Sequence, residues 1–242
     1  MGMRDTRSAL SDFDAAIRIN PKDRIAYRYR AYIYELTHEF DRAIADYNEA
    51  IRIQPNNPGY FADRARCYAT NSDWDRAIAD YSSAIQLAPK SAELFRLRGM
   101  TYVLKRDREK ALADLDTVVQ LQPHNAKSFL DRAQFYSLMG TSYRKSGDKD
   151  KANDVFAKSI ADCTEAIKLD PKHGAGYCER GDCYRRAMAY DKALADFAEA
   201  NRLEPENPRP YLGRCDVYLA TGDDQKYKEN RDRARALLSA RK

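Results

Sequence analysis

The chain has 242 residues, of which 43% are hydrophobic and 33% are charged, and its formal net charge is +5. No apolar run approaches the ~20 residues that a membrane-spanning helix needs, and charged residues at positions 4, 5 and 7 predict that no signal-peptide core is present at the start. The five cysteines are an odd number and are scattered along the chain, so we expect no disulfide framework and a reducing compartment, with the cytoplasm as the location.

The stretch from Pro58 to Ser91 is the unit around which the chain is organised, because shifting it by 34 positions superimposes it on similar segments. Prolines mark this period at Pro21, Pro55, Pro89 and Pro123, and again at Pro171 and Pro205. Self-similarity at such a period is typical of a repeat array. Apolar residues recur at helical spacing on both sides of a short turn, so each unit is predicted to be a helical hairpin.

Small and aromatic residues occupy fixed places in this unit. The small residues, which let helices approach closely, are Ala31, Ala65, Gly99, Ala133, Gly181 and Cys215 in the first helix and Ala43, Ala77, Ala111 and Ala193 in the second. Aromatic residues recur at 27, 61, 95, 129, 177 and 211, and at 34, 68, 102, 136, 184 and 218. We expect most of these rings to fill the space between hairpins.

This combination of period, small residues, aromatics and terminal proline resembles the tetratricopeptide repeat (TPR) family from about residue 4 to the end. The resemblance implies an all-α, right-handed superhelix of stacked hairpins in which the first helices line the concave side. It also implies a scaffold for protein binding and no enzymatic activity, although a fold does not fix the partner.

The period divides residues 4–240 into one continuous array. The predicted parts are a second helix alone at 4–23, regular repeats at 24–57, 58–91 and 92–125, an elongated repeat at 126–173, a regular repeat at 174–207 and a terminal repeat with a capping helix at 208–240. The missing first helix at 4–23 suggests that the chain begins inside a longer array.

The elongated repeat contains 14 additional residues. Its inter-helix turn is predicted at Gly147 and Asp148, so that each helix gains two turns and the hairpin projects by about 10 Å. One interpretation is a tolerated insertion at an exposed turn. The other is a docking hairpin, for an acidic partner surface or as a brace between two copies of the chain, with candidate residues Tyr143, Arg144, Lys145, Lys149 and Lys151.

An arginine precedes the small residue of each first helix, and an aspartate occupies the same place in each second helix except the last, which has Asn230. If each aspartate pairs with the arginine of the following repeat, all six pairs close. We therefore expect ion pairs between repeats, from Asp12–Arg30 to Asp196–Arg214, that fix the register of the hairpins.

The family geometry implies a partner-binding groove on the faces of the first helices. Its predicted lining is Arg28, Tyr29, Tyr32, Leu36, Asp63, Arg66, Arg96, Leu97, Met100, Leu104, Leu130, Asp131, Gln134 and Leu138, continued by Cys178, Glu179, Asp182, Arg185 and Arg186. Such a groove suits a peptide or helix with spaced apolar anchors. Asp63 and Tyr32 stand where chaperone-binding members of the family carry asparagine or lysine, so C-terminal tails of heat-shock chaperones are disfavoured as partners.

The sequence offers little catalytic chemistry, and we expect no cofactor and no enzyme. His173, Cys178 and Cys183 are the only metal-like grouping, and their spacing does not favour zinc. Two alternatives to peptide binding remain open. The basic elongated hairpin and C-terminal helix could bind nucleic acid, although interleaved acidic residues make this unfavourable; the incomplete N-terminal repeat could support self-association.

Overall fold

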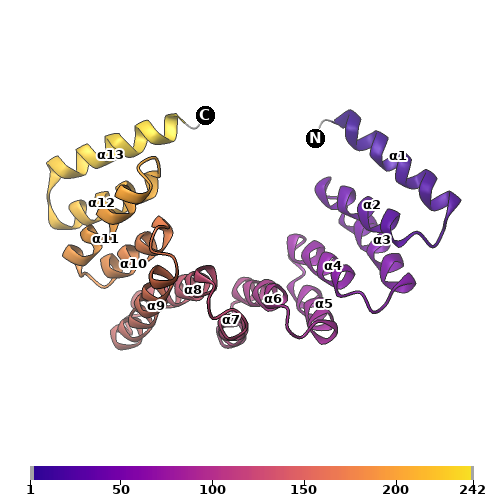
Figure 1. The fold of residues 1–242 in the computed structure, drawn as a ribbon, viewed down its shortest axis with the longest axis horizontal. Coiled ribbons are helices and arrows are strands. Elements are labelled where there is room, and N and C mark those ends of the chain that lie inside the picture. Colours follow the sequence, from indigo (N-terminus) through magenta and orange to yellow (C-terminus); the bar gives the residue numbers. More distant parts are fainter. Residues whose placement is uncertain (1–2, 241–242) are drawn as a thin grey trace. The chain divides into compact units, whose positions relative to one another are not determined.

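The computed structural model describes residues 3–240, with side chains from residue 6 onward, and this range contains thirteen α-helices and no strand (Figure 1). The all-α prediction is confirmed. The chain divides between Leu121 and Gln122 into two compact units, which we call unit 1 and unit 2 and describe separately. A single continuous array stays a prediction.

Unit 1 consists of one unpaired helix and three hairpins. Its helices are α1 (Met3–Ile19), α2 (Arg24–Leu36), α3 (Phe40–Ile53), α4 (Pro58–Thr70), α5 (Trp74–Leu87), α6 (Ala92–Lys105) and α7 (Arg108–Leu121). Unit 2 consists of three hairpins. Its helices are α8 (Ala126–Lys145), α9 (Lys149–Leu169), α10 (Gly174–Arg186), α11 (Tyr190–Leu203), α12 (Pro208–Thr221) and α13 (Asp224–Ser239).

Local sequence signals set the helix ends. The Asn57 side chain accepts a hydrogen bond from the Gly59 N–H at 2.9 Å, and Pro58 occupies the first helical position, where a missing N–H costs nothing. The turn inside each hairpin contains one residue in the left-handed region, and these residues recur at one place in the repeat: His38, Ser72, Arg106, Gly147, Met188 and Gly222. The Gly147 turn lies at its predicted position.

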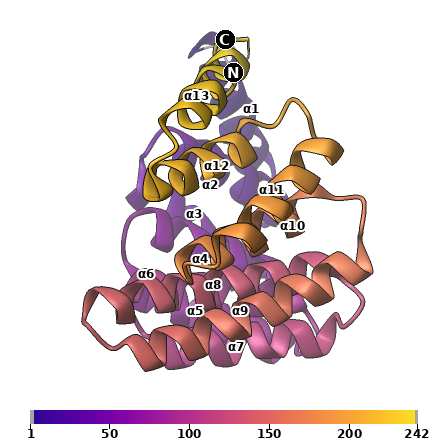
Figure 2. The same ribbon diagram turned by 90° about the vertical axis from the view of Figure 1, so that its left-hand side faces the viewer.

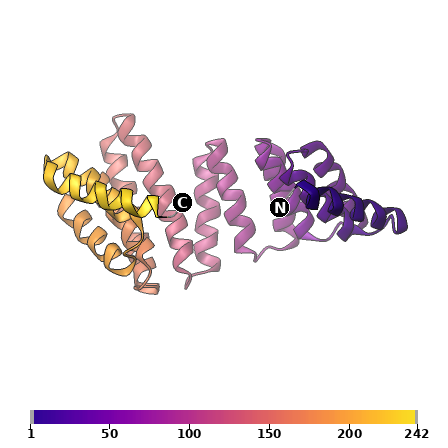
Figure 3. The same cartoon turned by 90° about the horizontal axis from the view of Figure 1, so that it is seen from above.

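Small residues bring the helices of each hairpin together. Ala31 and Ala43 are completely buried between α2 and α3, as are Ala65 and Ala77 between α4 and α5. The helices of a hairpin therefore run close and antiparallel (Figure 3). Rings from the second helices fill the space beside them, and Tyr47 is completely buried. The core is thus a row of small clusters, as expected when each repeat packs only on its neighbours.

The predicted ion pairs between repeats are wrong, because the aspartates pair within their own hairpins. The five pairs, at 2.7–2.8 Å, are Arg30–Asp46, Arg64–Asp80, Arg98–Asp114, Arg132–Asp162 and Arg180–Asp196. The physical reason is that each arginine and aspartate flank the small residues that close the hairpin, so they lie at the same level of it. Asp12 does not pair with Arg30.

The arginines still reach the preceding repeat, but through a different residue. Arg30 Nη1 lies 2.6 Å from Asp14 Oδ1 of α1, and Arg98 Nη1 donates to Ser82 Oγ of α5 at 2.9 Å. In both cases the partner lies 16 residues before the arginine. The guanidinium therefore joins its own hairpin to the preceding one, and its own aspartate holds it in place.

The elongated hairpin of unit 2 is a continuous pair of helices, with α8 and α9 side by side (Figure 2). Its added length is packed, because Ala152 and Phe156 of α9 are almost completely buried. Gly140 makes this approach possible, since a Cβ at position 140 would lie 2.6 Å from the Phe156 ring.

The last repeat lacks both partners of its arginine. Asn230 replaces the aspartate and donates instead to the Lys226 carbonyl, and Ala198 stands 16 residues before Arg214. Arg214 Nε is consequently buried without a hydrogen-bond partner. The guanidinium keeps a 3.3 Å contact with the Tyr218 hydroxyl.

Candidate functional site

The surface of unit 1 formed by α2, α4 and α6 exposes large apolar side chains. We call it the first-helix face of unit 1. The exposed fractions are 50% for Tyr29, 42% for Tyr32, 54% for Leu36, 52% for Met100 and 55% for Leu104. Their spacing of three or four residues puts the side chains of each helix on one side. Leu97, which is also a predicted lining residue, is half-buried and packs on the cluster around Ala65 and Tyr68.

A pocket of about 220 Å³ opens on this face. Its lining is Arg28, Tyr29, Tyr32, Tyr47, Asp63 and Arg66. Five of these six are predicted lining residues, brought together from α2 and α4, while Tyr47 comes from α3 and is completely buried. The sequence places Tyr47 in the core and so gives no sign that it also closes a pocket.

Charged residues hold the pocket walls. Arg66 Nη1 donates to Glu35 Oε1 at 2.8 Å, and the Tyr47 hydroxyl donates to Glu35 Oε2 at 3.2 Å. Arg28 Nε donates to Asp63 Oδ2 at 2.5 Å. Burial raises the pKa of the Glu35 carboxyl, although Arg66 opposes this effect. The hydrogen bond from Arg28 to Asp63 raises the pKa of the Arg28 guanidinium.

Glu35 is a residue of this site that the sequence interpretation missed. It is only 6% exposed. The signal that could have found it is its place in the repeat, where the other repeats have Ala69, Val103 and Ser137. Glu35 is the only carboxylate at this place in the repeats, where Arg185 and Leu219 follow in the last two, and a buried carboxylate needs a partner.

At the α6 end of the face, Arg96 is tied to its own helix. Its guanidinium makes two hydrogen bonds to Glu93, at 2.6 and 2.7 Å, and Nη1 lies 3.1 Å from Met100 Sδ. The exposed apolar surface here is therefore formed by Met100 and Leu104, with Arg96 beside them.

Unit 2 presents a different surface on α8, α10 and α12. A groove of about 670 Å³ contains the predicted residues Leu130, Asp131 and Gln134, and Leu130 forms part of its buried floor. Asp131 accepts from Lys127 at 2.7 and 2.9 Å. Leu138 is 54% exposed. Cys178, by contrast, is completely buried, so its predicted place on the groove surface is wrong; burial raises the pKa of its thiol to about 12.

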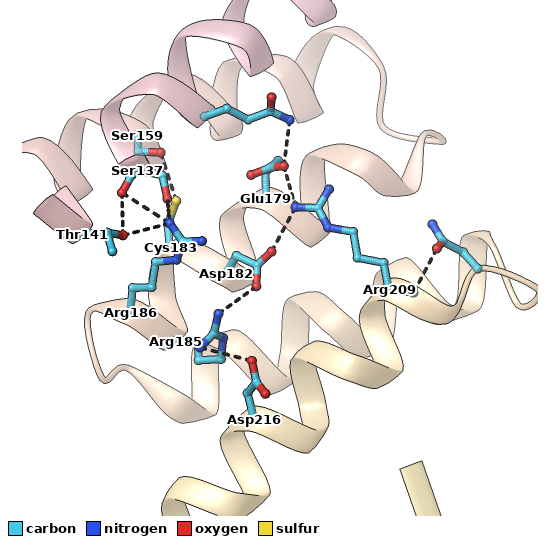
Figure 4. Close-up of polar contacts among 12 residues, drawn as sticks. Ser137, Thr141, Ser159, Glu179, Asp182, Cys183, Arg185, Arg186, Arg209 and Asp216 are labelled. Atoms are coloured by element: carbon cyan, nitrogen blue, oxygen red, sulfur yellow. Dashed lines mark hydrogen bonds and ion pairs between the residues drawn. The ribbon is translucent and has the colours of Figure 1, made fainter. Parts of the chain in front are cut away.

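A chain of polar contacts crosses the first helices of unit 2 (Figure 4). Glu179 accepts from Gln134 at 2.8 Å and from Arg209 at 2.5 Å, which links α8, α10 and α12. Arg209 also reaches Asp182 at 3.0 Å. Arg185 lies 3.4 Å from both Asp182 and Asp216.

Arg186 turns the other way in the same view and donates to Ser137 and Thr141 of α8 (Figure 4). The predicted residues of α10 thus come together with Arg209 and Asp216, which the sequence interpretation did not include. Most of these charges are balanced by one another and brace neighbouring hairpins.

The predicted docking hairpin carries less free positive charge than its sequence indicates. Lys151 pairs with Asp148 at 2.8 Å and lies over the Tyr143 ring, and the Arg144 guanidinium lies 5.2 Å from the centre of the Phe156 ring. Lys145 and Lys149 are exposed. A role for this hairpin stays a prediction.

The part of the chain with described side chains contains no group of three His, Cys, Asp or Glu residues that could hold a metal ion. Cys178 and Cys183 are completely buried, whereas the His173 side chain is 59% exposed. Within residues 3–240, no helix has the length and apolar character needed to cross a membrane.

Stacked helical hairpins whose first helices share one face define a helical solenoid. Solenoids are repeat proteins that present extended binding surfaces. The particular family follows from the sequence comparison. Two models described as tetratricopeptide repeat match residues 64–139, and residues 1–58 together with 137–208. The chain belongs to the tetratricopeptide repeat family, whose members are generally scaffolds for protein interactions.

Solved structures share this fold at low sequence identity. A TPR protein from Parabacteroides merdae is 19% identical with a TM-score of 0.68, covering 96% of this chain and 87% of that one. YrrB, described as a TPR protein with an unusual peptide-binding site, is 18% identical with a TM-score of 0.58, covering 84% and 97%. The MamA protein is 20% identical with a TM-score of 0.60, covering 76% and 92%. No curated protein matches the chain.

Proposed function

We propose that this chain is a non-enzymatic scaffold that binds a partner peptide or helix on the first-helix face of unit 1. The observation that carries the proposal is the set of five large apolar side chains there, each 42–55% exposed. The five lie on α2 and α6 beside the charged residues Asp63 and Arg66 of α4, and exposed apolar surface next to polar residues is typical of an interaction site. The partner is a protein, because apolar anchors at helical spacing match an amphipathic helix or an extended segment.

The tyrosines support binding more strongly than exposed aliphatic residues alone would. Tyrosine supplies a large contact area at a small entropic cost and is enriched among the residues that dominate interface energies. Tyr29 is already stacked on Phe13 of α1, with ring centres 5.9 Å apart, so its orientation is set before a partner arrives. The peptide-binding site named for YrrB is consistent with this use of the fold.

Affinity capture from extract of the source cell tests the proposal, with captured proteins quantified by isotope labelling. The face variant carries Tyr29→Glu, Met100→Glu and Leu104→Glu. The matched control carries Ile19→Glu, Leu87→Glu and Leu169→Glu, three exposed residues at the ends of α1, α5 and α9. We expect a partner whose recovery falls at least tenfold in the face variant and less than twofold in the control. Equal recovery by all three proteins would contradict the proposal.

The alternatives have less support. Nucleic-acid binding needs uncompensated basic residues, yet Lys151 and Lys158 of the elongated hairpin pair with Asp148 and Asp154. Self-association through α1, and a cytoplasmic location, stay predictions.

A further inference from the structure

The pocket on the first-helix face of unit 1 has the size of one side chain. Its volume of about 220 Å³ is below the ~300–1,000 Å³ of pockets that hold a whole small molecule. The pocket therefore suits a single large anchor, while the rest of a peptide lies along the face.

The pocket is formed before any partner binds. Glu35 and Asp63 fix the two arginines, and the Arg66 guanidinium lies 5.4 Å from the centre of the Tyr32 ring. Because these side chains already have partners, little rotamer freedom is lost when a ligand enters. Two half-exposed phenol rings and two guanidinium planes thus form the surface that a guest meets.

The charged groups of the pocket that keep unused hydrogen-bonding capacity are mainly donors. Both oxygens of Glu35 are occupied, one by Arg66 and one by Tyr47. Both oxygens of Asp63 face guanidinium groups, Oδ2 at 2.5 Å from Arg28 Nε and Oδ1 at 3.7 Å from Arg66 Nη2. The Arg28 side chain is 44% exposed, and its Nη1 and Nη2 groups donate to no residue in the range 6–240. The Arg28 N–H groups can therefore bind an acceptor that the guest brings.

Resting on the proposed function, we infer that this pocket takes an aromatic side chain of the partner peptide, and that Arg28 binds an acceptor oxygen beside it, most favourably an adjacent carboxylate. An aromatic ring stacks on Tyr29 or Tyr32 and receives the guanidinium groups over its face. A lysine would meet two guanidinium cations, and an aliphatic side chain would fit without the ring contacts.

The test begins with 12-residue random peptides displayed on phage and selected on the immobilised full chain. Selected peptides are synthesised in three versions: unchanged, with the ring replaced by leucine, and with the adjacent carboxylate replaced by its amide. Affinities are measured by fluorescence polarisation against wild type, Tyr32→Ala and Arg28→Gln. Thermal unfolding confirms that each variant is folded.

We expect the selected peptides to contain an aromatic residue with an acidic neighbour. Tyr32→Ala should weaken the unchanged peptide at least tenfold and the leucine version less than threefold. Arg28→Gln should weaken the unchanged peptide but leave the amide version within twofold. A purely structural effect of either variant would weaken every peptide version equally, and that result would overturn the inference.

Leu104→Ala, at the other end of the same face, separates this inference from the proposed function. Peptides that lose affinity in Leu104→Ala but bind Tyr32→Ala as tightly as wild type would overturn the inference and leave the proposed function standing. A library that yields no peptide sensitive to either variant contradicts both.

Discussion

The last hairpin can be stabilised by one substitution, Asn230→Asp, because Arg214 lacks the carboxylate that five equivalent arginines have. Arg214 Nε is already buried without a partner, so its desolvation cost is present in the wild type. The change offers two charge-assisted hydrogen bonds, like those of 2.8 Å between Arg180 and Asp196.

The expected stabilisation is the free energy gained from the new hydrogen bonds minus the free energy lost when the new carboxylate gives up its hydration. Hydrogen bonds to charged groups contribute about 1.5–3 kcal/mol each, and Asn230, at 6% exposure, occupies a site where a new carboxylate loses several kcal/mol of hydration. We expect a net gain of about 1–2 kcal/mol in the free energy of unfolding of this hairpin. In a chain of this size that corresponds to a rise of about 2–8 °C in Tm.

Thermal unfolding and amide hydrogen exchange of α12 and α13 at pH 7 measure this gain. The control is the same change in an Arg214→Leu background, where the new carboxylate is buried unpaired and should cost about 3 kcal/mol. An ion-paired carboxyl has a lowered pKa, so the gain should disappear as pH falls below about 4. An Asn230→Asp protein that is no more stable than wild type at pH 7 would refute the reasoning.

Three further predictions concern buried polar groups. Asn201→Ile should raise the free energy of unfolding by about 1–2 kcal/mol in urea titrations. The reason is that Asn201 Oδ1 and Nδ2 are buried without hydrogen-bond partners, at a place where other repeats have Ile51, Ile85 and Ile167. A loss of stability would contradict this. A thiol reagent at pH 8 should label the five cysteines only after unfolding, because all five are buried. Burial also raises the pKa of Cys67 and Cys178 to about 12, which keeps these thiols protonated. Rapid labelling of the native protein would contradict this prediction. Burial raises the folded-state pKa of Glu35 above its ordinary value, so its stabilising contribution should fall as pH rises through that pKa. The stability of wild type relative to Glu35→Gln should therefore decrease with rising pH, and an increase in this difference would contradict the prediction.

Much of the fold follows from the sequence because each repeat carries its own signals. Asn57 and Pro58 start a helix, and the small residues Ala65 and Ala77 specify where two helices touch. Gly147 marks the displaced turn of the elongated hairpin. These features act over a few residues, so periodicity alone reveals them.

The sequence pattern could not predict which aspartate each arginine pairs with, the one in its own hairpin or the one in the preceding repeat. Counting pairs favours the inter-repeat arrangement, because only then do all six aspartates have partners. The actual choice depends on which helix lies level with Arg30, and the close approach at Ala31 and Ala43 decides it in favour of Asp46. Asp14, the second contact of Arg30, has no constant residue type in the other repeats, which have Asn48 and Ser82 at that place.

The sequence predicted only part of the candidate site, because the site too depends on how helices pack. Helical spacing identifies Tyr29 and Tyr32 as neighbours on one face, but the pocket also needs Tyr47 from another helix and a buried carboxylate at Glu35. Such a site depends on the packing of three helices, so no single stretch of the sequence predicts it.

The elongated hairpin has a consequence for how unit 2 folds. In a solenoid, folding can begin at any repeat and spread to its neighbours, and it begins most readily where contacts are close in sequence. The paired helices α8 and α9 bury Ala152, Val155 and Phe156 within a single hairpin. We therefore expect unit 2 to begin folding at that hairpin, with α10 to α13 assembling on it in order, and we expect its amides to be the last of the unit to exchange with solvent.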